Sequence, residues 1–494
     1  MESVAAGRKL TDRAEVRHLL RRLAFGSTEA LETALTGLTV DEALDVLVNG
    51  AKRAPRPAPP PFVLREWINN ALLFTDITAT EYHRAFTAQD AAAHADIERL
   101  RHWWLREMIA GEAPLRENLV LFLHGTLGST TGSVNVPQAL HGRNDRLRRG
   151  CLGTLPALLE SLVTDPAMMI QIGMDEYREA DMFDEEFPNF RPGRLVLDNW
   201  TVGPGSYAQE DVAELCRALT GWTLQAPSGY EPTRTIDPEG FRSQRRTGLH
   251  PVFEPAHFVD RPKAILGRRD AFDAASAVGH LARQPATGRR YGRLLMRYFG
   301  VDDADGTLEQ RLAATYQDTD GSLVALVRDI AASDTFWSPA SRWALVKSPV
   351  HLAVGACRQL EVSRPPLAAL STWLTAAGQR LFQTPNFGSA GWSGQEAWVE
   401  PPERLAVRYG LGRILTSGSL PDLGLVESAD AGQAAAYVGE RYRRAEPSVL
   451  LDRLDPAPGI ELAEVAEDGA ATDSAARAAA TIQRIMATAE YQLA

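Results

Sequence analysis

The sequence predicts a mainly α protein: one large helical domain with irregular loops and at most a small β region. Three observations lead to this fold class. Apolar residues recur at helical spacing along most of the 494-residue chain. Residues that favour helix starts, such as Ser, Thr and Asp, precede several of these runs. Alternating apolar and polar runs, which would predict strands, are sparse.

The N-terminal segment, residues 1–50, is predicted to contain two helices. Residues 11–26 place four apolar side chains on one helix face: Val16, Leu19, Leu20 and Leu23. In residues 39–50, Thr39 is the expected N-cap, because its hydroxyl can accept an N–H of the first turn. Residues 51–63 follow as a connection whose five prolines exclude a regular helix and favour an extended chain.

Residues 64–494 are predicted to form the main helical body, with the N-terminal segment packed on it as part of one domain. A long helix is expected over residues 81–109, and another over 206–222, where Ser206 and Gln209 fit a capping box. Ser348 followed by proline predicts a further helix start. Residues 223–268, which are rich in proline, glycine and arginine, predict a long loop or a small hairpin region.

The composition argues against several classes of protein. With 52 basic and 63 acidic residues, the net charge is -11, which gives no support to nucleic-acid binding. The three cysteines are widely separated and form neither a disulfide framework nor a thiolate zinc motif. No apolar run is long enough to span a membrane, and the first residues lack the apolar core of a signal peptide. We therefore expect a cytoplasmic protein that does not bind membranes.

One short stretch raises a chemical question. In LVLFLHGTLGST, residues 119–130, an apolar run stops at His124 and a turn of small residues follows. His124 could end a strand and support an oxyanion hole, but the G-x-S-x-G motif of such hydrolases is missing. It could instead bind a metal, which usually requires three or more converging ligands. The third alternative, and the commoner one for a lone histidine, is a buried structural role.

Several stretches, taken together and in order, resemble the DUF1800 family, a bacterial family named as a domain of unknown function. The resemblance covers the chain from residue 17 to the C-terminus. It is carried by RHLLRRLAFGST, RENLVLFLHGTLGST, DPAMM, VGPGSYAQEDVAELCRALTGW, HFVDRPKAILG, RLLMRYF, VKSPVHLAVG, GQRLFQTPNFGSAGWSGQEAW and MATAEYQ. The resemblance implies a helical fold of this family's type, but no particular reaction, because the family is named without one.

The departures from the family pattern bear on chemistry. The family segment written L-F-W-H-N-H-F has a second histidine where this chain has Thr126, and two family glutamates correspond to Phe190 and Leu195. The residue types imply a His/Glu/Asp cluster in the family, which would suit a divalent transition metal in a helical body. In this chain, the reduced cluster would consist of His124, His257 and Asp260 as metal ligands, with Arg194 and Asp198 as catalytic groups.

Two other regions are candidates for substrate binding. GSAGWSGQEAW holds Trp392 and Trp398 close to glycines, a combination that can line a pocket or simply pack a loop. Lys263 lies in the basic stretch RPKAILGRR and would form either a positively charged lip for an anionic substrate or part of a solvated loop.

Two functions are compatible with these observations. The first is a metal-dependent enzyme, hydrolytic or oxidative, in which the metal activates water or oxygen or polarises a carbonyl of a small molecule. The second is a degenerate member of the family that acts as a scaffold and binds a protein partner. The lost glutamates and histidine favour the second, whereas the retained histidines and the tryptophan-containing loop favour the first. The metal, the substrate and the oligomeric state do not follow from the sequence.

Overall fold

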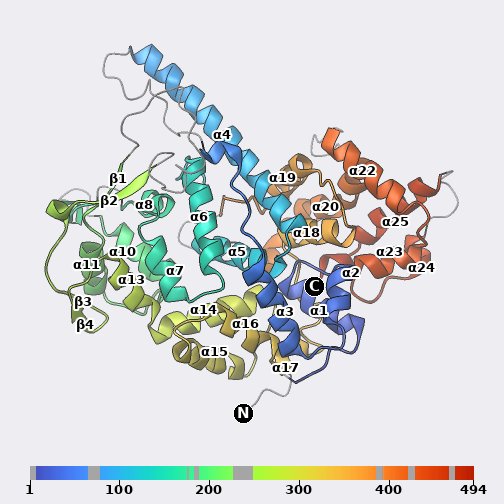
Figure 1. Cartoon of the computed structure of the whole chain (residues 1–494), viewed down its shortest axis with the longest axis horizontal. Coiled ribbons are helices and arrows are strands. Elements are labelled where there is room, and N and C mark those ends of the chain that lie inside the picture. The colour runs from blue at the N-terminus through green and yellow to red at the C-terminus, as the bar shows by residue number, and fades with distance from the viewer. Residues whose placement is uncertain are drawn as a thin grey trace.

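The mainly helical fold is confirmed by the structure, a computed structural model shown in Figure 1. The structure describes residues 7–64, 78–128, 130–174, 177–182, 189–225, 249–384, 392, 394–420, 429–466 and 473–494. In this part of the chain, helices make up most of the regular structure, and the named strands form two sheets of two strands each.

The elements follow one another along the chain in a largely helical order. The first half contains α1 (Arg13–Leu23), α2 (Glu29–Leu35), α3 (Val40–Arg53), η1 (Pro61–Leu64), α4 (Ala79–Ala110), α5 (Pro114–Leu127), α6 (Pro137–Gly150), α7 (Leu155–Leu162), α8 (Pro166–Ile172), α9 (Glu179–Met182), α10 (Arg191–Leu195), the π-helical turn η3 (Val196–Trp200), α11 (Gln209–Ala218), β1 (Trp222–Gln225) and β2 (His250–Phe253). The second half contains η4 (Pro255–His257), β3 (Lys263–Ile265), β4 (Arg268–Asp270), α13 (Ala274–Ala282), α14 (Pro285–Tyr298), α15 (Thr307–Asp318), α16 (Leu323–Ala331), α17 (Asp334–Trp337), α18 (Pro349–Gln359), α19 (Leu367–Ala376), η5 (Gln395–Trp398), α20 (Pro402–Tyr409), α21 (Leu411–Ser417), α22 (Ala429–Arg441), α23 (Pro447–Leu454), α24 (Leu462–Val465), α25 (Ser474–Met486) and η7 (Glu490–Gln492).

Most helix starts follow the local sequence rules. Thr39 caps α3, and the side chains of Thr39 and Glu42 make the reciprocal bonds of a capping box. Thr78 caps the long helix α4 in the same way, and Ser348 caps α18 ahead of a proline, as predicted. At its other end, α3 continues to Arg53, so the proline-rich connection begins three residues later than expected.

The predicted start of α11 is wrong by two to three residues. No capping box forms between Ser206 and Gln209, because Gln209 is itself the first helical residue. Instead, the Asp211 carboxylate accepts the N–H of Ala208 at 2.8 Å. Its other oxygen accepts the N–H of Leu266 at 2.7 Å, so one acidic side chain holds the helix start and the neighbouring hairpin together.

The small β region lies where the sequence predicts it. β1 pairs antiparallel with β2, and β3 pairs antiparallel with β4. Residues 226–248 of the predicted irregular region lie outside the described residues. Gly221 has a φ of +86°, which turns the chain out of the helix and directly into β1. Trp222 is therefore a strand residue opposite Phe253, and the helix predicted over residues 206–222 ends earlier, at Ala218.

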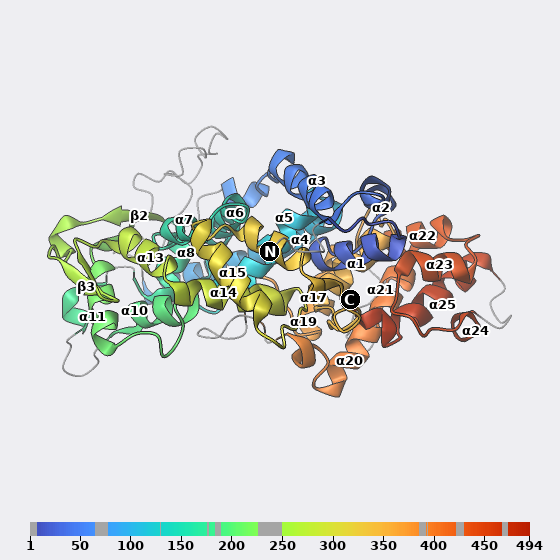
Figure 2. The ribbon, with the colours of Figure 1, turned by 90° about the horizontal axis from the view of Figure 1, so that it is seen from below.

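One continuous cluster of buried side chains extends from Leu10 to Tyr491. α5 is buried along almost its whole length and contacts α1, α3, α4 and α6. Figures 1 and 2 both show the C-terminal helices close to α1. Ion pairs connect them, since Arg17 and Arg21 of α1 pair with Asp452 and Asp455. The first and last segments therefore pack against one another, while the division into domains stays a prediction.

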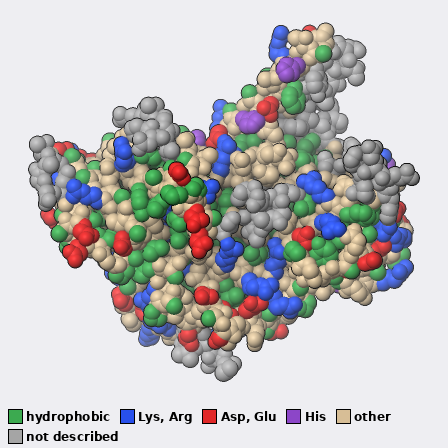
Figure 3. Space-filling model, turned by 180° about the vertical axis from the view of Figure 1, so that it is seen from behind, with side chains coloured by type: hydrophobic (Ala, Val, Ile, Leu, Met, Phe, Trp, Pro, Cys, Tyr) green, Lys and Arg blue, Asp and Glu red, His purple; other side chains and the backbone are tan. Residues whose placement is uncertain are grey.

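Among the described residues, none of the helices combines the length and the apolar character that crossing a bilayer requires. The N-terminal half of α4 projects from the body (Figure 1). On the face shown in Figure 3, basic and acidic side chains are interspersed over the body.

A buried ion pair between α5 and α6 lies near the centre of the core. The Arg148 guanidinium donates two bonds to the Glu117 carboxylate, at 2.8 and 2.7 Å. The Trp104 indole donates a third, at 3.1 Å. Both charged side chains are at most 3% exposed. Nε of Arg116 lies 3.6 Å from the same carboxylate. Because burial disfavours each charge by itself, Arg148 depends on Glu117, and Glu117 depends mainly on Arg148.

We expect Arg148→Met to lower the free energy of unfolding by about 3 kcal/mol, because it removes the two bonds of Arg148 and leaves the buried Glu117 carboxylate with only the longer contact to Nε of Arg116, at 3.6 Å. The double variant Arg148→Met/Glu117→Gln should recover most of this loss, since it keeps an acceptor for Trp104 and removes the uncompensated charge. Urea unfolding followed by circular dichroism measures both values. A double variant no more stable than the single variant would contradict this account of the pair.

Candidate functional site

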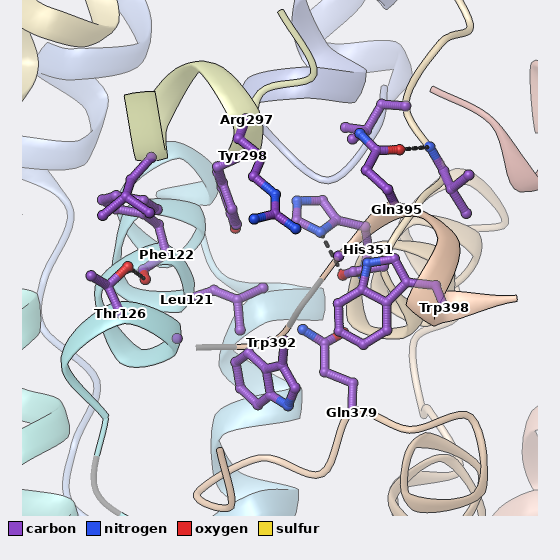
Figure 4. A pocket seen from close by; sticks show the side chains of 16 residues that line it. Leu121, Phe122, Thr126, Arg297, Tyr298, His351, Gln379, Trp392, Gln395 and Trp398 are labelled. Carbon is purple, nitrogen blue, oxygen red and sulfur yellow. Dashed lines mark hydrogen bonds between the residues drawn. The ribbon is translucent and has the colours of Figure 1, made fainter. Parts of the chain in front are cut away.

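A pocket lies between α5, α14, the start of α18 and the segment that carries Trp392 and Trp398 (Figure 4). Its free volume is about 100 Å³. One water molecule needs roughly 10–15 Å³, so the pocket has room for a small ligand. Its walls are mainly apolar. Among the described residues that line it, Arg297 is the one arginine, and there is no lysine or carboxylate.

Helical spacing explains how two helices form the walls. On α5, Leu121 and Gly125 are four residues apart and therefore face the same side. On α14, three lining residues share a face in the same way: Leu294, Arg297 and Tyr298. A side-chain carbon added at Gly125 would lie 3.3 Å from the Trp392 ring, so the glycine lets the indole pack directly on α5. Figure 4 shows Arg297 and Tyr298 at one end of the pocket and Trp392 at the other.

The polar side of the pocket is organised by Asn118, which is fully buried in α5. Nε2 of His351 lies 3.0 Å from Oδ1 of Asn118, and the Tyr298 hydroxyl donates to the same oxygen at 2.6 Å. The Asn118 amide nitrogen donates to the carbonyl oxygen of Arg22 at 2.9 Å. On the other side of the imidazole, Oγ of Ser348 lies 2.8 Å from Nδ1.

This network fixes the tautomer of His351. A backbone carbonyl oxygen can only accept, so the NH₂ group of Asn118 faces Arg22 and Oδ1 faces His351. Nε2 of His351 must therefore carry the proton that is donated to Oδ1. Nδ1 is left without a proton and accepts the hydroxyl of Ser348. The pocket thus presents a neutral imidazole and two hydroxyl groups.

The contact between Ser348 and His351 resembles a nucleophile next to a base, but the electrostatics oppose that use. Burial, and then the charges of Lys347 and Arg22, lower the pKa of His351 to about 3. Relative to an ordinary histidine, protonation is disfavoured by roughly 5 kcal/mol. A general base works best with a pKa near the working pH. The arrangement therefore suits hydrogen bonding to a ligand better than proton transfer.

His124 lies on α5 but faces the core. The segment around it is helical, so the strand-and-oxyanion-hole alternative is wrong. Its side chain is almost fully buried, and Nε2 accepts the backbone N–H of Phe382 at 3.1 Å. The rings of Trp104 and Phe382 pack edge-on against it, with centroid distances of 4.9 and 5.1 Å. Burial, and then the charge of Arg143, lower its pKa to about 3. These contacts favour the structural role.

The helix also separates His124 from position 126. Two residues of an α-helix are about 200° apart, so the two side chains cannot face one site. Thr126 lines the pocket, and its hydroxyl donates to the carbonyl oxygen of Phe122 at 3.0 Å. The threonine that replaces the second histidine of the family segment therefore belongs to the pocket, whereas His124 belongs to the core.

The predicted metal ligands do not form a group in the structure. His257 follows β2 in η4, and its Nδ1 lies 2.8 Å from the Glu254 carboxylate. Asp260 is exposed in the turn that follows. Across the described residues, no three histidine, cysteine or acidic side chains lie together in a way that could hold a metal ion. The assignment of His124, His257 and Asp260 as one ligand set therefore receives no support.

Arg194 and Asp198 lie together, but away from the pocket. Asp198 accepts the Tyr207 hydroxyl at 2.6 Å, and Arg194 donates to the side chain of Gln209. Tyr207 lies next to both residues. Burial and then the bond to Asp198 raise the pKa of Tyr207 to about 12, and the nearby charge of Arg194 lowers it in part. Neither Arg194 nor Asp198 is among the pocket residues. Their catalytic role stays a prediction.

Both alternatives predicted for Lys263, a positively charged lip and a solvated loop, place its side chain at the surface, and both are wrong. Its side chain is 1% exposed, and Nζ donates to the carbonyl oxygens of Arg261 at 3.1 Å and Phe272 at 2.8 Å. Lys263 opens β3, where side chains alternate between buried and exposed, and its position faces inward with Ile265. The basic stretch therefore wrongly predicted an exposed Lys263, because only every second side chain of this strand faces solvent.

Trp392 and Trp398 do line the pocket, as the sequence suggests, and their role in binding a substrate stays a prediction. Sequence reasoning missed Asn118, Tyr298 and His351. One local signal was available, since Ser348 and His351 stand three residues apart at a helix start, where their side chains meet. Asn118 and Tyr298 come from two other helices, α5 and α14, and no short motif reveals their contact with His351.

The comparisons with known proteins identify a family and nothing more specific. The model of a family described as "Protein of unknown function (DUF1800)" matches residues 18–493. No curated protein and no solved structure matches the chain.

We expect the stability of the protein to fall as the pH drops below about 6.5, partly because of His124. Its pKa is lowered to about 3 in the folded state, so below the ordinary histidine value of about 6.5 the unfolded chain binds a proton that the folded chain does not. Between about pH 6 and pH 4, this histidine should contribute a slope of about 1.4 kcal/mol per pH unit.

The variant His124→Gln should reduce that slope by about 1.4 kcal/mol per pH unit, since glutamine keeps an acceptor for Phe382 but does not titrate. His83→Gln, at an exposed position of α4, is the matched control. Urea unfolding at several pH values gives the slopes. An unchanged slope in His124→Gln would mean that His124 is not held neutral in the folded protein.

Proposed function

The chain belongs to the DUF1800 family, and we propose that it binds a small molecule with an apolar, planar body and one anionic group in the pocket beside α5. The observation that supports this proposal is the composition of the pocket. Two tryptophans offer flat apolar walls, and Arg297 brings a positive charge to the described lining. An anionic ligand would be attracted by this charge, and a guanidinium suits a carboxylate best.

The neutral network adds hydrogen-bonding specificity. The hydroxyls of Ser348 and Tyr298 and the amide of Gln379 border the same space. Gln379 is oriented by the N–H of Val350, which donates to its side-chain oxygen at 2.8 Å. Because its oxygen is held by Val350, Gln379 offers its NH₂ group to a ligand as an oriented donor at little further cost in entropy. The hydroxyls of Tyr298 and Ser348, whose protons are donated to Asn118 and His351, offer acceptors. The proposal therefore keeps the small-molecule part of the sequence prediction. It leaves the metal part aside, since the predicted ligands His124 and His257 serve other contacts.

Benzoate is a direct probe of this proposal, because it combines an aromatic ring with a carboxylate. We expect benzoate to raise the melting temperature in a saturating manner, and neutral benzamide to act at least tenfold more weakly. Arg297→Gln should weaken benzoate binding by at least tenfold, because a hydrogen bond to a charged group contributes about 1.5–3 kcal/mol. Isothermal titration calorimetry measures the affinities.

Two variants make the test specific to the pocket. Arg293→Gln is the matched control, since Arg293 is an exposed arginine one turn away on α14 and pairs with Glu309. It should bind benzoate as the wild type does. Leu294→Trp should fill the pocket and abolish binding. If benzoate and larger aromatic carboxylates leave the wild type unchanged, or if Leu294→Trp binds normally, the proposed ligand site is wrong.

A further inference from the structure

Arg143, on α6, is a buried cation without a hydrogen-bond partner. Its side chain is almost fully enclosed, with the residue 2% exposed. Among the described residues, none of its three guanidinium nitrogens, Nε, Nη1 and Nη2, has a hydrogen-bond partner. Buried polar groups in folded proteins are nearly always paired, and a buried charge even more so. This side chain therefore calls for a partner that the described part of the chain does not supply.

Other buried arginines of the described chain show the usual arrangement. Arg148 pairs with Glu117, and Arg22 donates to the carbonyl oxygen of Phe299 at 2.5 Å. Arg358 and Arg408 also donate to backbone oxygens, those of Ile109 and Lys347. Each of these four has at least one strong acceptor. Arg143 differs because its whole planar group of donors is unused.

The nearest acid does not neutralise Arg143 directly. Asp165, the N-cap of α8, is close enough to affect its charge, but the two form no ion pair. One oxygen of Asp165 accepts the backbone N–H groups of Ala167 and Met168, and the other lies 3.0 Å from Nε of Arg146. The carboxylate is therefore already bound to three other groups, two backbone N–H groups and Arg146.

The remaining neighbours do not supply a negative charge. His124 is close enough for Arg143 to lower its pKa, which is about 3, so this imidazole is neutral at physiological pH. Burial lowers the pKa of Arg143 itself to about 10, which still leaves the guanidinium charged. Asn144, the next residue, has a second buried donor without a partner, its side-chain nitrogen. Arg146 adds a second positive charge close by, so these groups give a local excess of positive charge. The Asn144 side chain is held by Arg148, which donates to its oxygen.

We propose that Arg143 is the centre of a buried site for a small oxyanion, a carboxylate or a phosphate-type group, held between α5, α6 and α8. A planar guanidinium with free donors matches two oxygens of such an anion in a bidentate manner. A bound anion would satisfy the donors of Arg143 and compensate its charge. This site is distinct from the pocket beside Arg297, and it does not depend on the function proposed for that pocket.

Formate, the smallest carboxylate, tests this proposal first. The melting temperature of the wild type is measured in HEPES while sodium formate, phosphate or chloride is added, with ionic strength held constant by the bulky HEPES anion. We expect a saturating increase with formate or phosphate and a weaker response to chloride. Broadening of the ¹³C-formate resonance by the protein provides a second measurement, which does not rely on stability.

Four variants assign the response to Arg143. Arg143→Met should remove both the saturating increase and the line broadening, and Arg143→Lys, which keeps the charge but loses the planar fork, should weaken the affinity at least tenfold. Arg149→Met, at a half-exposed position of the same helix, and Arg297→Gln in the other pocket should respond as the wild type does. Equal melting temperatures in all anions with no line broadening would overturn the proposal. A response retained in Arg143→Met, or one to chloride alone, would overturn it as well.

Discussion

The side chain of Asn118 is the contact on which the arrangement of the site depends. It is buried in α5 and joins three other helices, through the carbonyl of Arg22, the hydroxyl of Tyr298 and the imidazole of His351. These helices are far apart in the sequence. A primary amide has a donor end and an acceptor end that cannot be exchanged, so its orientation at Arg22 determines what His351 can do. A single buried amide thereby links the packing of the core to the chemistry of the pocket.

With this network, the pocket is suited to hydrogen bonding with a ligand rather than to proton transfer. His351 is buried, and Lys347 and Arg22 lie close by. Burial first, and then these nearby positive charges, keep the imidazole neutral. The same logic recurs at His124, where an imidazole serves as a buried acceptor for a backbone N–H. His124, which the sequence offered as a metal ligand, and His351 therefore both act as buried, uncharged hydrogen-bonding groups.

Local features of the structure could be predicted from the sequence, whereas contacts between distant residues could not. The caps at Thr39 and Ser348 could be predicted because they involve residues three positions apart. The mainly helical class followed from periodicity alone. By contrast, the partner of His124 is Phe382, 258 positions away, and no local pattern encodes that contact. Lys263 was misjudged for a related reason, because charge predicts exposure on average while burial is decided by the strand that carries the residue.

The protonation state of His351 tests this account most directly. Nitrogen NMR of protein labelled with ¹⁵N-histidine distinguishes the two neutral tautomers from the imidazolium, and a His351→Gln variant assigns the signal. Our account predicts the neutral tautomer with the proton on Nε2 at pH 7, and the same form at pH 5, because the pKa is about 3. An imidazolium at pH 5, or a proton on Nδ1 at pH 7, would contradict the orientation of Asn118 and the site that depends on it.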